Sequence, residues 1–244
     1  MTQQLAVVTG GLGAIGSAIV DALRASGHTV VALDHPAAQP RAPEWLAARP
    51  GAAVFHADLA DTAETLATMQ AIDAAHGPIS VLVNAAGITR DARFVKMSVE
   101  QWRAVLGSNL DSVFNTTQPV FAGMCARGFG RIVNIASVNG QKGQFGQANY
   151  SAAKAGMHGF TMALAQEGAA QGVTVNTVSP GYIATPMTAA IKPEALAKVN
   201  AQIPLGRMGR PEEIARVVAF LCAADSAYIT GANVPVNGGL YMGH

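Results

Sequence analysis

Short apolar runs alternate with longer amphipathic segments along the whole chain. The apolar runs have the length and composition of buried strands, and they are Leu5–Val8, Thr29–Leu33, Ala53–His56, Val81–Val83, Ile132–Ile135, Val173–Val178 and Asn233–Val236. The segments between them have the period of amphipathic helices and lie near residues 14–26, 62–75, 99–127, 150–171 and 211–223. The pattern therefore predicts strands that alternate with helices.

Strand–helix alternation of this kind is typical of a parallel sheet covered by helices on both faces. We expect an α/β fold in which residues 1–244 form a single domain, a Rossmann-type doubly wound parallel sheet. No linker, repeat or low-complexity tract divides the chain. Two stretches are less regular, 35–50 and 182–207. The second follows the carboxyl end of a predicted strand, so we expect it to form a lid over a substrate.

Composition narrows the classes of protein to which the chain can belong. Half of the 244 residues are hydrophobic and 13% are charged, which indicates a large core and further burial between subunits. The formal net charge of +1 and the lack of a basic run argue against a nucleic-acid partner. Cys125 and Cys222 lie in apolar contexts without metal-like spacing, so we expect reduced thiols and no metal site. The sequence has no bilayer-spanning apolar run and no signal-type N-terminus, which favours a cytoplasmic protein without membrane partners.

A glycine-rich turn follows the first predicted strand and opens the first helix, with the sequence Gly10-Gly11-Leu12-Gly13-Ala14-Ile15-Gly16. Glycine lets the backbone turn sharply and approach a pyrophosphate, which binds at the positive N-terminus of the helix. In an alternating α/β chain, this position favours a dinucleotide-binding loop over a simple tight connection.

Asp34 closes the second predicted strand. A carboxylate there can accept both hydroxyls of an adenosine ribose, whereas a turn-forming Asp before His35-Pro36 is the structural alternative. The same charge would repel the 2′-phosphate of NADP, so Asp34 favours NAD(H). Arg41 is close enough in sequence to offset this repulsion, which leaves NADP(H) open.

Two later strand ends carry further candidate cofactor contacts. Asp58-Leu59 follows the third strand, where the carboxylate either reaches the adenine edge or caps the helix that begins near Thr62. Asn84-Ala85-Ala86-Gly87 follows the fourth strand. Its small residues either let the cofactor ribose lie against the sheet or form a tight turn.

Tyr150 and Lys154 lie four residues apart on a predicted helix and therefore share one face. An ammonium about 4 Å from a phenolate is worth roughly 4 kcal/mol at an effective dielectric near 20. We therefore expect Lys154 to lower the pKa of Tyr150 toward neutrality, where a phenol transfers protons readily. Ser137 offers a hydroxyl to a carbonyl oxygen beside it. Taken alone, such a pair is more often a contact on a helix surface.

These motifs occur together, and in this order, in the short-chain dehydrogenase/reductases, which the chain resembles over nearly its whole length. The resemblance is carried by Thr9–Gly16, Asp58, Asn84–Gly87, Asn109, Asn134–Ser137, Tyr150–Lys154 and Pro180–Thr185. Ala14 stands where the family often has a glycine, and Ala85 where it often has an Asn. Both residues are small enough to leave cofactor binding intact.

The resemblance implies a catalytic set and a cofactor site. Ser137 would orient the substrate carbonyl, Tyr150 would be the general acid in reduction, and Lys154 would also bind the nicotinamide ribose. Asn109 would hold a water that passes protons to Lys154, unless it only marks a polar kink in its helix. The implied cofactor-binding residues are Gly10, Leu12, Gly13, Ala14, Ile15, Gly16, Asp34, Asp58, Leu59, Asn84, Ala85, Ala86, Gly87, Tyr150, Lys154, Pro180, Gly181, Ile183 and Thr185. A homotetramer is usual in the family.

Within this family, the chain is similar to the acetoacetyl-CoA reductases of polyhydroxybutyrate synthesis. This closer resemblance is carried by Ser137–Gln147, His158–Glu167, Gly87–Asp91 and Asn237–Leu240. It implies reduction of acetoacetyl-CoA, a short 3-oxoacyl thioester, to (R)-3-hydroxybutyryl-CoA. The residues implied at the substrate are Asp91, Gln144, Phe145, Gln147 and Tyr182. Those reductases usually prefer NADPH and lack an acid at the end of the second strand, so Asp34 departs from their pattern.

Other activities fit the same motifs. A 3-oxoacyl-carrier-protein reductase would need a basic patch, for which Arg127 and Arg131 are candidates. An NAD-dependent (R)-3-hydroxybutyrate dehydrogenase would need a base near its carboxylate substrate, and Lys96, Lys142 and Lys192 are candidates. A reductase of small ketones is a further alternative. A non-catalytic dinucleotide sensor would not need the intact Asn, Ser, Tyr and Lys set.

Overall fold

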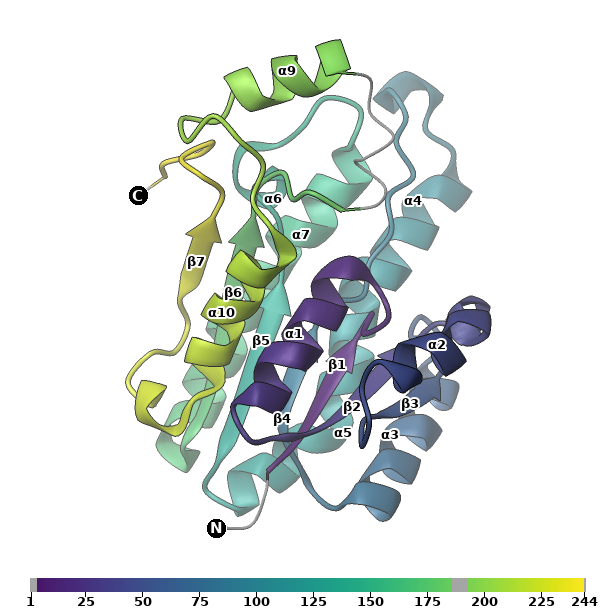
Figure 1. Ribbon diagram of the computed structural model, residues 1–244, viewed down its shortest axis with the longest axis vertical. Helices are drawn as coiled ribbons and strands as arrows, with labels where there is room; N and C mark the ends of the chain where they lie inside the picture. The colour runs from purple at the N-terminus through teal and green to yellow at the C-terminus, as the bar shows by residue number, and fades with distance from the viewer. Residues whose placement is uncertain (1–3, 186–192, 244) are drawn as a thin grey trace.

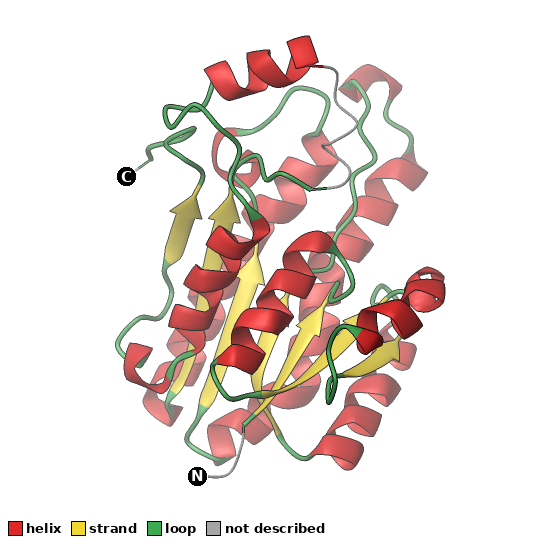
Figure 2. Ribbon diagram, in the orientation of Figure 1, coloured by secondary structure: helices red, strands yellow, loops and turns green. Residues whose placement is uncertain are grey.

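The computed structural model describes residues 4–185 and 193–243, and a seven-stranded parallel sheet forms its centre (Figures 1 and 2). The strand order is β3-β2-β1-β4-β5-β6-β7. The strands are β1 (Leu5–Thr9), β2 (Thr29–Asp34), β3 (Ala53–His56), β4 (Ile79–Asn84), β5 (Gly130–Ile135), β6 (Val173–Pro180) and β7 (Asn233–Val236). The predicted α/β class is confirmed, and every predicted strand is present.

Helices cover both faces of the sheet (Figure 1). One face packs against α1 (Ala14–Ala25) and α10 (Pro211–Cys222), and the other against α3 (Thr62–His76), α5 (Ser112–Ala126) and α7 (Ala148–Gly168). The shorter elements are η1 (Pro36–Arg41), α2 (Ala42–Ala47), η2 (Phe94–Lys96), α4 (Val99–Leu106), η3 (Gly107–Asp111), α6 (Asn139–Lys142), η4 (Ala169–Gln171), α9 (Pro193–Ala201) and η5 (Ala224–Ser226). In the described part of the chain, no helix is long and apolar enough to cross a membrane.

Strand β1 shows why its sequence is apolar from Leu5 to Val8. Its side chains alternate between the two faces, so Ala6 and Val8 join the core under α1 and α10. Leu5 and Val7 join the core on the other face. Because helices cover both faces, all four of these positions favour apolar side chains.

The order of the strands creates a crevice at one end of the sheet. The chain runs from β1 outward through β2 to β3, and then returns to place β4 on the other side of β1. The loops that follow β1 and β4 therefore leave in opposite directions at the carboxyl ends of these strands. In open α/β sheets, ligands bind at such a switch point.

Three stretches differ from the simple pattern read in the sequence. The helix predicted at 99–127 is divided into α4 and α5 by the π-helical segment η3. The irregular stretch 35–50 contains η1 and α2, which Trp45 ties to α1 by donating to the hydroxyl of Ser17 at 2.8 Å. The expected lid, 182–207, includes α9, while its residues 186–192 lie outside the described residues.

A ladder of buried polar side chains joins the middle strands to the helices behind them. Asn84 donates to the side-chain oxygen of Asn134 at 2.8 Å and accepts a hydrogen bond from Thr116 at 2.7 Å. Asn134 donates to Thr161 at 2.8 Å, and Thr177 donates to the same hydroxyl at 2.8 Å. All five side chains are at most 2% exposed. The ladder therefore fixes β4, β5 and β6 against α5 and α7.

We expect Thr161→Val to destabilise the protein although it preserves the shape of the side chain. The substitution leaves a buried amide of Asn134 and the hydroxyl of Thr177 without their shared partner, which costs about 1–3 kcal/mol. Thr68→Val, on the partly exposed face of α3, is the matched control and should change the free energy of unfolding by less than about 0.5 kcal/mol. Equal urea midpoints for the two variants would contradict the role given to the ladder.

Candidate active site

The glycine-rich turn brings the backbones of two strand ends into contact. Gly10 has a φ of +62°, and a Cβ at this residue would lie 2.9 Å from the Cα of Ala86. A Cβ at Gly16 would collide with the carbonyl of Gly10. The amides of Ala85 and Ala86 donate to the hydroxyl of Thr9, at 3.0 and 3.1 Å. The turn therefore closes tightly on the loop after β4, as the predicted dinucleotide loop requires.

Helix α1 begins at this turn, and its N-terminus faces the largest cavity described. Gly13 precedes the helix and provides no side-chain cap, so the first amides of α1 remain available to an anion. The cavity has a volume of about 720 Å³. Its predicted cofactor residues are Gly10, Leu12, Gly13, Ala14, Ile15, Gly16, Asp34, Asp58, Leu59, Ala85, Ala86, Gly87 and Thr185. The shape and the lining fit a dinucleotide with its pyrophosphate at α1.

Asp34 links the end of β2 to the glycine-rich turn. One carboxylate oxygen accepts the amide of Leu12 at 2.9 Å, and the other accepts the amide of His35 at 2.8 Å. The carboxylate is thus held in place at the cavity wall, half-exposed, with lone pairs left for a ribose. Arg41 lies on the same wall, where its guanidinium donates to the carbonyl of Leu12 at 3.4 Å.

The structure decides between the two roles that the sequence left open for Asp58, a cofactor contact and the cap of α3. Asp61, and not Asp58, caps α3 by accepting the amides of Ala63 and Glu64, both at 2.9 Å. Asp58 accepts only the amide of Ala60 at 3.0 Å and lines the cavity. The capping alternative for Asp58 is therefore wrong.

Besides Tyr150 and Lys154, four predicted cofactor residues do not line this cavity. The side chain of Asn84 belongs to the buried ladder under the site. Pro180 ends β6, and Gly181 donates its amide to Val236 at 3.0 Å. Ile183 is 7% exposed and pairs with Gly209. A cofactor contact by any of these four stays a prediction.

Tyr150 and Lys154 share one face of α7, as their spacing predicts. The ammonium nitrogen of Lys154 lies 5.7 Å from the centroid of the Tyr150 ring. It donates to the carbonyl of Ile135, at the end of β5, at 2.7 Å. Lys154 is 3% exposed, so the strand end holds its charged group within the protein.

Asn109 lies close to Lys154 because of the π-helical segment. Its side-chain nitrogen donates to the carbonyls of Ile88 and Val105, at 2.9 and 2.8 Å. Its side-chain oxygen is buried, and no hydrogen-bond partner for it is found among the described residues. A Cβ at Gly87 would touch this oxygen and would lie 3.5 Å from the nitrogen of Lys154. Asn109 thus both marks an irregular turn and presents an acceptor beside Lys154.

Burial controls the proton affinity of both groups. It lowers the pKa of Lys154 from 10.5 to about 7. It raises the pKa of Tyr150, which the hydroxyl of Ser137 lowers and the carboxylate of Asp91 raises further. The prediction that Lys154 lowers the pKa of Tyr150 is therefore wrong for this structure. Desolvation of the phenolate is the largest cause of the shift, and burial also desolvates Lys154.

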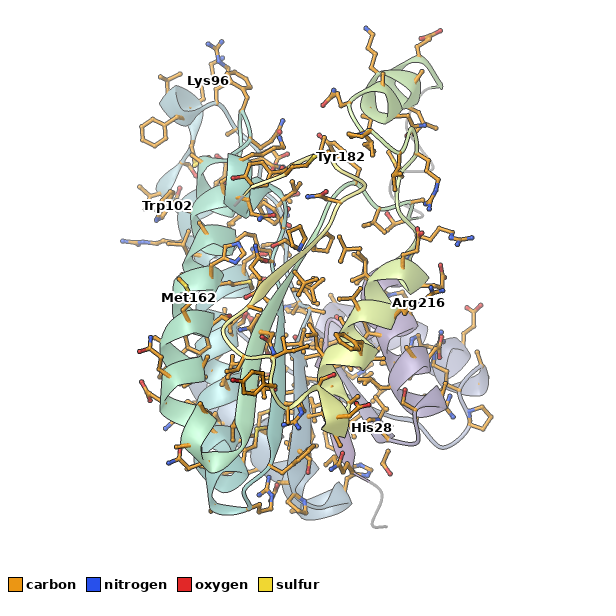
Figure 3. All side chains as sticks on the ribbon, turned by 90° about the vertical axis from the view of Figure 1, so that its left-hand side faces the viewer. His28, Lys96, Trp102, Met162, Tyr182 and Arg216 are labelled. Atoms are coloured by element: carbon orange, nitrogen blue, oxygen red, sulfur yellow. The ribbon has the colours of Figure 1, made fainter. Side chains whose placement is uncertain are left out.

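The residues implied at the substrate divide between several places. Asp91 accepts a hydrogen bond from Gln147 at 2.9 Å. Gln144 and Phe145 line a separate hollow of about 300 Å³, where Phe145 is 81% exposed. Tyr182 lies on the loop after β6, at the same end of the molecule as Lys96 (Figure 3). All of these residues follow the carboxyl ends of strands, but the structure does not place them in one cavity.

Several cavity residues were missed in the sequence. His35 and Ala57 follow β2 and β3, while Ile88 and Ser108 adjoin the predicted Gly87 and Asn109. Each of them adjoins a predicted contact in the sequence, and this was the available signal. None of them is of a residue type that marks a cofactor site by itself.

A family model described as enoyl-(acyl carrier protein) reductase matches residues 11–241. The chain belongs to the short-chain dehydrogenase/reductase family. It is 55% identical over 243 residues to an acetoacetyl-CoA reductase of Allochromatium vinosum, covering 98% of this chain and 99% of the relative. It is 52% identical over 247 residues to an acetoacetyl-CoA reductase of Cupriavidus necator, covering 100% of both chains. A 3-oxoacyl-acyl-carrier-protein reductase of Vibrio cholerae is 43% identical over 241 residues, covering 98% of both chains.

As a short-chain dehydrogenase/reductase, the protein is an oxidoreductase that acts on a CH–OH group with a nicotinamide dinucleotide. The cavity at α1 is the place that fits this cofactor. Among the described residues, no group of three or more His, Cys, Asp or Glu is arranged to hold a metal ion.

The depressed pKa of Lys154 should make the stability of the protein depend on pH. Between about pH 7 and pH 10.5, the unfolded chain keeps a proton on Lys154 that the folded protein lacks, so stability rises with pH. The slope is about 1.4 kcal/mol per pH unit. We expect Lys154→Met to abolish this contribution in urea unfolding curves measured at pH 7.0, 7.75 and 8.5. Parallel pH dependences in the two proteins would show that Lys154 is not desolvated as described.

Proposed function

We propose that this protein reduces acetoacetyl-CoA to (R)-3-hydroxybutyryl-CoA, as a step in polyhydroxybutyrate synthesis. The observation that carries the proposal is the arrangement of Ser137, Tyr150 and Lys154. They lie beside the loop in which Gln147 donates a hydrogen bond to Asp91. Relatives at 55% and 52% identity that bear the name acetoacetyl-CoA reductase support the same substrate.

When bound along the cavity at α1, the nicotinamide dinucleotide would supply the hydride for the ketone carbon. Ser137 positions the ketone oxygen by donating its hydroxyl proton. Tyr150 then gives its phenolic proton to that oxygen, and burial keeps the phenol protonated at neutral pH because it disfavours the phenolate. One hydride and one proton are thus added to the ketone, and an alcohol results.

Lys154 and Asn109 restore the proton on Tyr150. With a pKa of about 7, Lys154 can give up and regain a proton near neutral pH. The buried oxygen of Asn109, next to Lys154 across Gly87, is suited to hold a water that connects this pair to solvent. Lys154 also holds the ribose of the nicotinamide in this proposal.

The position of the arginines argues against a carrier-protein substrate. Arg131 is 2% exposed, and its guanidinium donates to the carbonyls of Ala223 and Ala224, at 3.2 Å each. Arg127 donates to the carbonyl of Ile79, at 2.6 Å. Both lie at the amino-terminal end of the sheet, away from Tyr150. The prediction that Arg131 contributes to a docking patch is therefore wrong.

The dehydrogenase alternative loses one of its candidate bases. The ammonium of Lys142 is held by the side chain of Gln144 at 2.9 Å. Lys96 lies on the exposed segment η2, and Lys192 lies outside the described residues. The reductase is the function that the described geometry favours.

We infer that the protein is a cytoplasmic homotetramer. Large apolar side chains are exposed on three helices, with Phe114 53% exposed on α5, Met162 53% on α7 and Phe220 56% on α10. Met162 and Arg216 lie on opposite sides of the molecule (Figure 3), so more than one face offers a subunit contact.

The free thiols of Cys125 and Cys222 fit a reducing compartment. Residues 182–207 would close over the substrate.

The substrate is tested by measuring turnover of acetoacetyl-CoA, a longer 3-oxoacyl-CoA, free acetoacetate and a simple ketone. We expect kcat/KM to be highest for acetoacetyl-CoA. Tyr150→Phe should lower kcat by a factor of about 10² or more, because the proton donor is lost, while NADH still binds. Normal turnover in this variant would refute the mechanism, and a preference for free acetoacetate would favour the dehydrogenase.

The cofactor preference is tested by titrating the protein with NADH and NADPH. We expect tighter binding of NADH by a factor of about 10 or more, because Asp34 repels the 2′-phosphate. Asp34→Ser should narrow this ratio, and Arg41→Ala serves as its control on the same cavity wall. Tighter binding of NADPH, lost in Arg41→Ala, would show that Arg41 dominates the ribose pocket.

A further inference from the structure

A chain of hydrogen bonds connects the catalytic serine to Asp91 through two side-chain amides. The backbone amide of Asn139 donates to the hydroxyl oxygen of Ser137 at 3.1 Å. The side-chain nitrogen of Asn139 donates to the side-chain oxygen of Gln147 at 2.9 Å. The side-chain nitrogen of Gln147 then donates to the carboxylate of Asp91 at 2.9 Å. Three segments are joined in this way: α6, the loop before α7, and the segment after β4.

The carboxylate of Asp91 determines which way both amides point. An ionised carboxylate only accepts hydrogen bonds, so Gln147 must turn its NH₂ group toward Asp91. Its oxygen then faces Asn139, which must also present its NH₂ group. If either amide were reversed, two acceptors would face each other. One charged group therefore sets the orientation of two neutral ones.

Backbone contacts hold both ends of this chain in place. The fully buried side chain of Asn149 donates to the carbonyl of Arg90 at 3.1 Å, next to Asp91. The amide of Ala92 donates to the carbonyl of Gly146 at 2.9 Å, next to Gln147. The register of the two segments is therefore fixed by residues that adjoin each side chain. The contact between Gln147 and the exposed Asp91 is therefore supported by the backbone on both sides.

The chain leaves one hydrogen-bonding capacity free at each of two positions. Ser137 accepts from Asn139 and keeps a hydroxyl proton to donate, which Tyr150 meets in this structure and a carbonyl oxygen would meet when substrate binds. Gln147 uses one N–H for Asp91, so its second N–H remains available for another acceptor. The side-chain oxygen of Asn139 is buried, and no partner for it is found among the described residues. Two donors near Tyr150 are thus pre-oriented.

We propose that Asn139 is a positioning residue: its side chain, tied through Gln147 to Asp91, holds in place the backbone amide that donates to the hydroxyl of Ser137. The free N–H of Gln147 then binds a carbonyl of the substrate thioester or its pantetheine arm, while Ser137 binds the ketone. This inference rests on the proposed function and specifies how that site recognises a substrate with two separated carbonyl acceptors.

Exchanging the two end groups of the chain tests this role. Asn139→Asp places a second carboxylate against Gln147, so one carboxylate must face the amide oxygen. The double variant Asp91→Asn/Asn139→Asp has the composition and charge of the wild type, with the order of acceptor and donor reversed. In the double variant, Gln147 can satisfy both neighbours by turning its amide over.

We expect Asn139→Asp to lower kcat for acetoacetyl-CoA by a factor of about 10 to 100, because misplaced substrate groups slow the reaction by this much. The double variant should recover most of this loss in kcat. Its KM should stay raised, because the free N–H of Gln147 now points the other way. The dissociation constant for NADH should match that of the wild type in both variants, since the chain does not touch the cofactor cavity.

Gln141→Glu is the matched control, because it makes the same change from amide to carboxylate on α6. Combining Gln141→Glu with Asp91→Asn should not raise kcat above the value for Gln141→Glu alone. If Asn139→Asp fails to bind NADH, Asn139→Ser replaces it. This variant lacks the reach to Gln147 and should lose kcat without rescue by Asp91→Asn.

The outcomes separate this inference from the proposed function. A wild-type protein that does not reduce acetoacetyl-CoA would refute the proposed function. With an active wild type, unchanged kcat in Asn139→Asp would overturn the positioning role. A double variant no faster than Asn139→Asp would overturn it as well.

Discussion

The site depends on the ladder of buried amides and hydroxyls that runs from Asn84 through Asn134 and Thr161 to Thr177. Parallel strands are hydrophobic on both faces, so polar groups in the middle of such a sheet are stable only when each finds its partner. The partners here come from three strands and two helices. Satisfying them fixes the strand ends that carry the catalytic residues relative to α7, and it leaves little freedom for other arrangements.

Above the ladder, burial has opposite consequences for the two central titratable groups. Desolvation lowers the pKa of Lys154, and for the same reason it raises the pKa of Tyr150. A surface pair with the same spacing would show the ordinary attraction between ammonium and phenolate. Inside the protein, desolvation is the larger effect. At neutral pH the phenol of Tyr150 is therefore protonated, which is the form that a proton donor to a ketone needs.

Much of the fold and of the candidate site was predictable, because local patterns carried it. The strands, the glycine-rich turn and the Tyr150–Lys154 spacing follow from periodicity and residue type alone. A kink at Asn109 was one interpretation of the sequence, but the π-helical form of residues 107–111 was not predictable from it. Whether Asp58 contacts the cofactor or caps α3 also stayed open, because an Asp before a helix fits either role until the backbone positions of Asp58 and Asp61 are known.

The sequence by itself determined the α/β class, a candidate dinucleotide loop and the Tyr150–Lys154 pair, while the role of Asn109 came from the resemblance to the family. These depend on residue type and on spacing along one element, which a chain carries before it folds. Only the tertiary structure decided the direction of the pKa shifts, the burial of Arg131 and the hydrogen-bonded chain from Ser137 to Asp91. Each of these depends on how closely segments distant in sequence approach one another, and on how much water that approach removes.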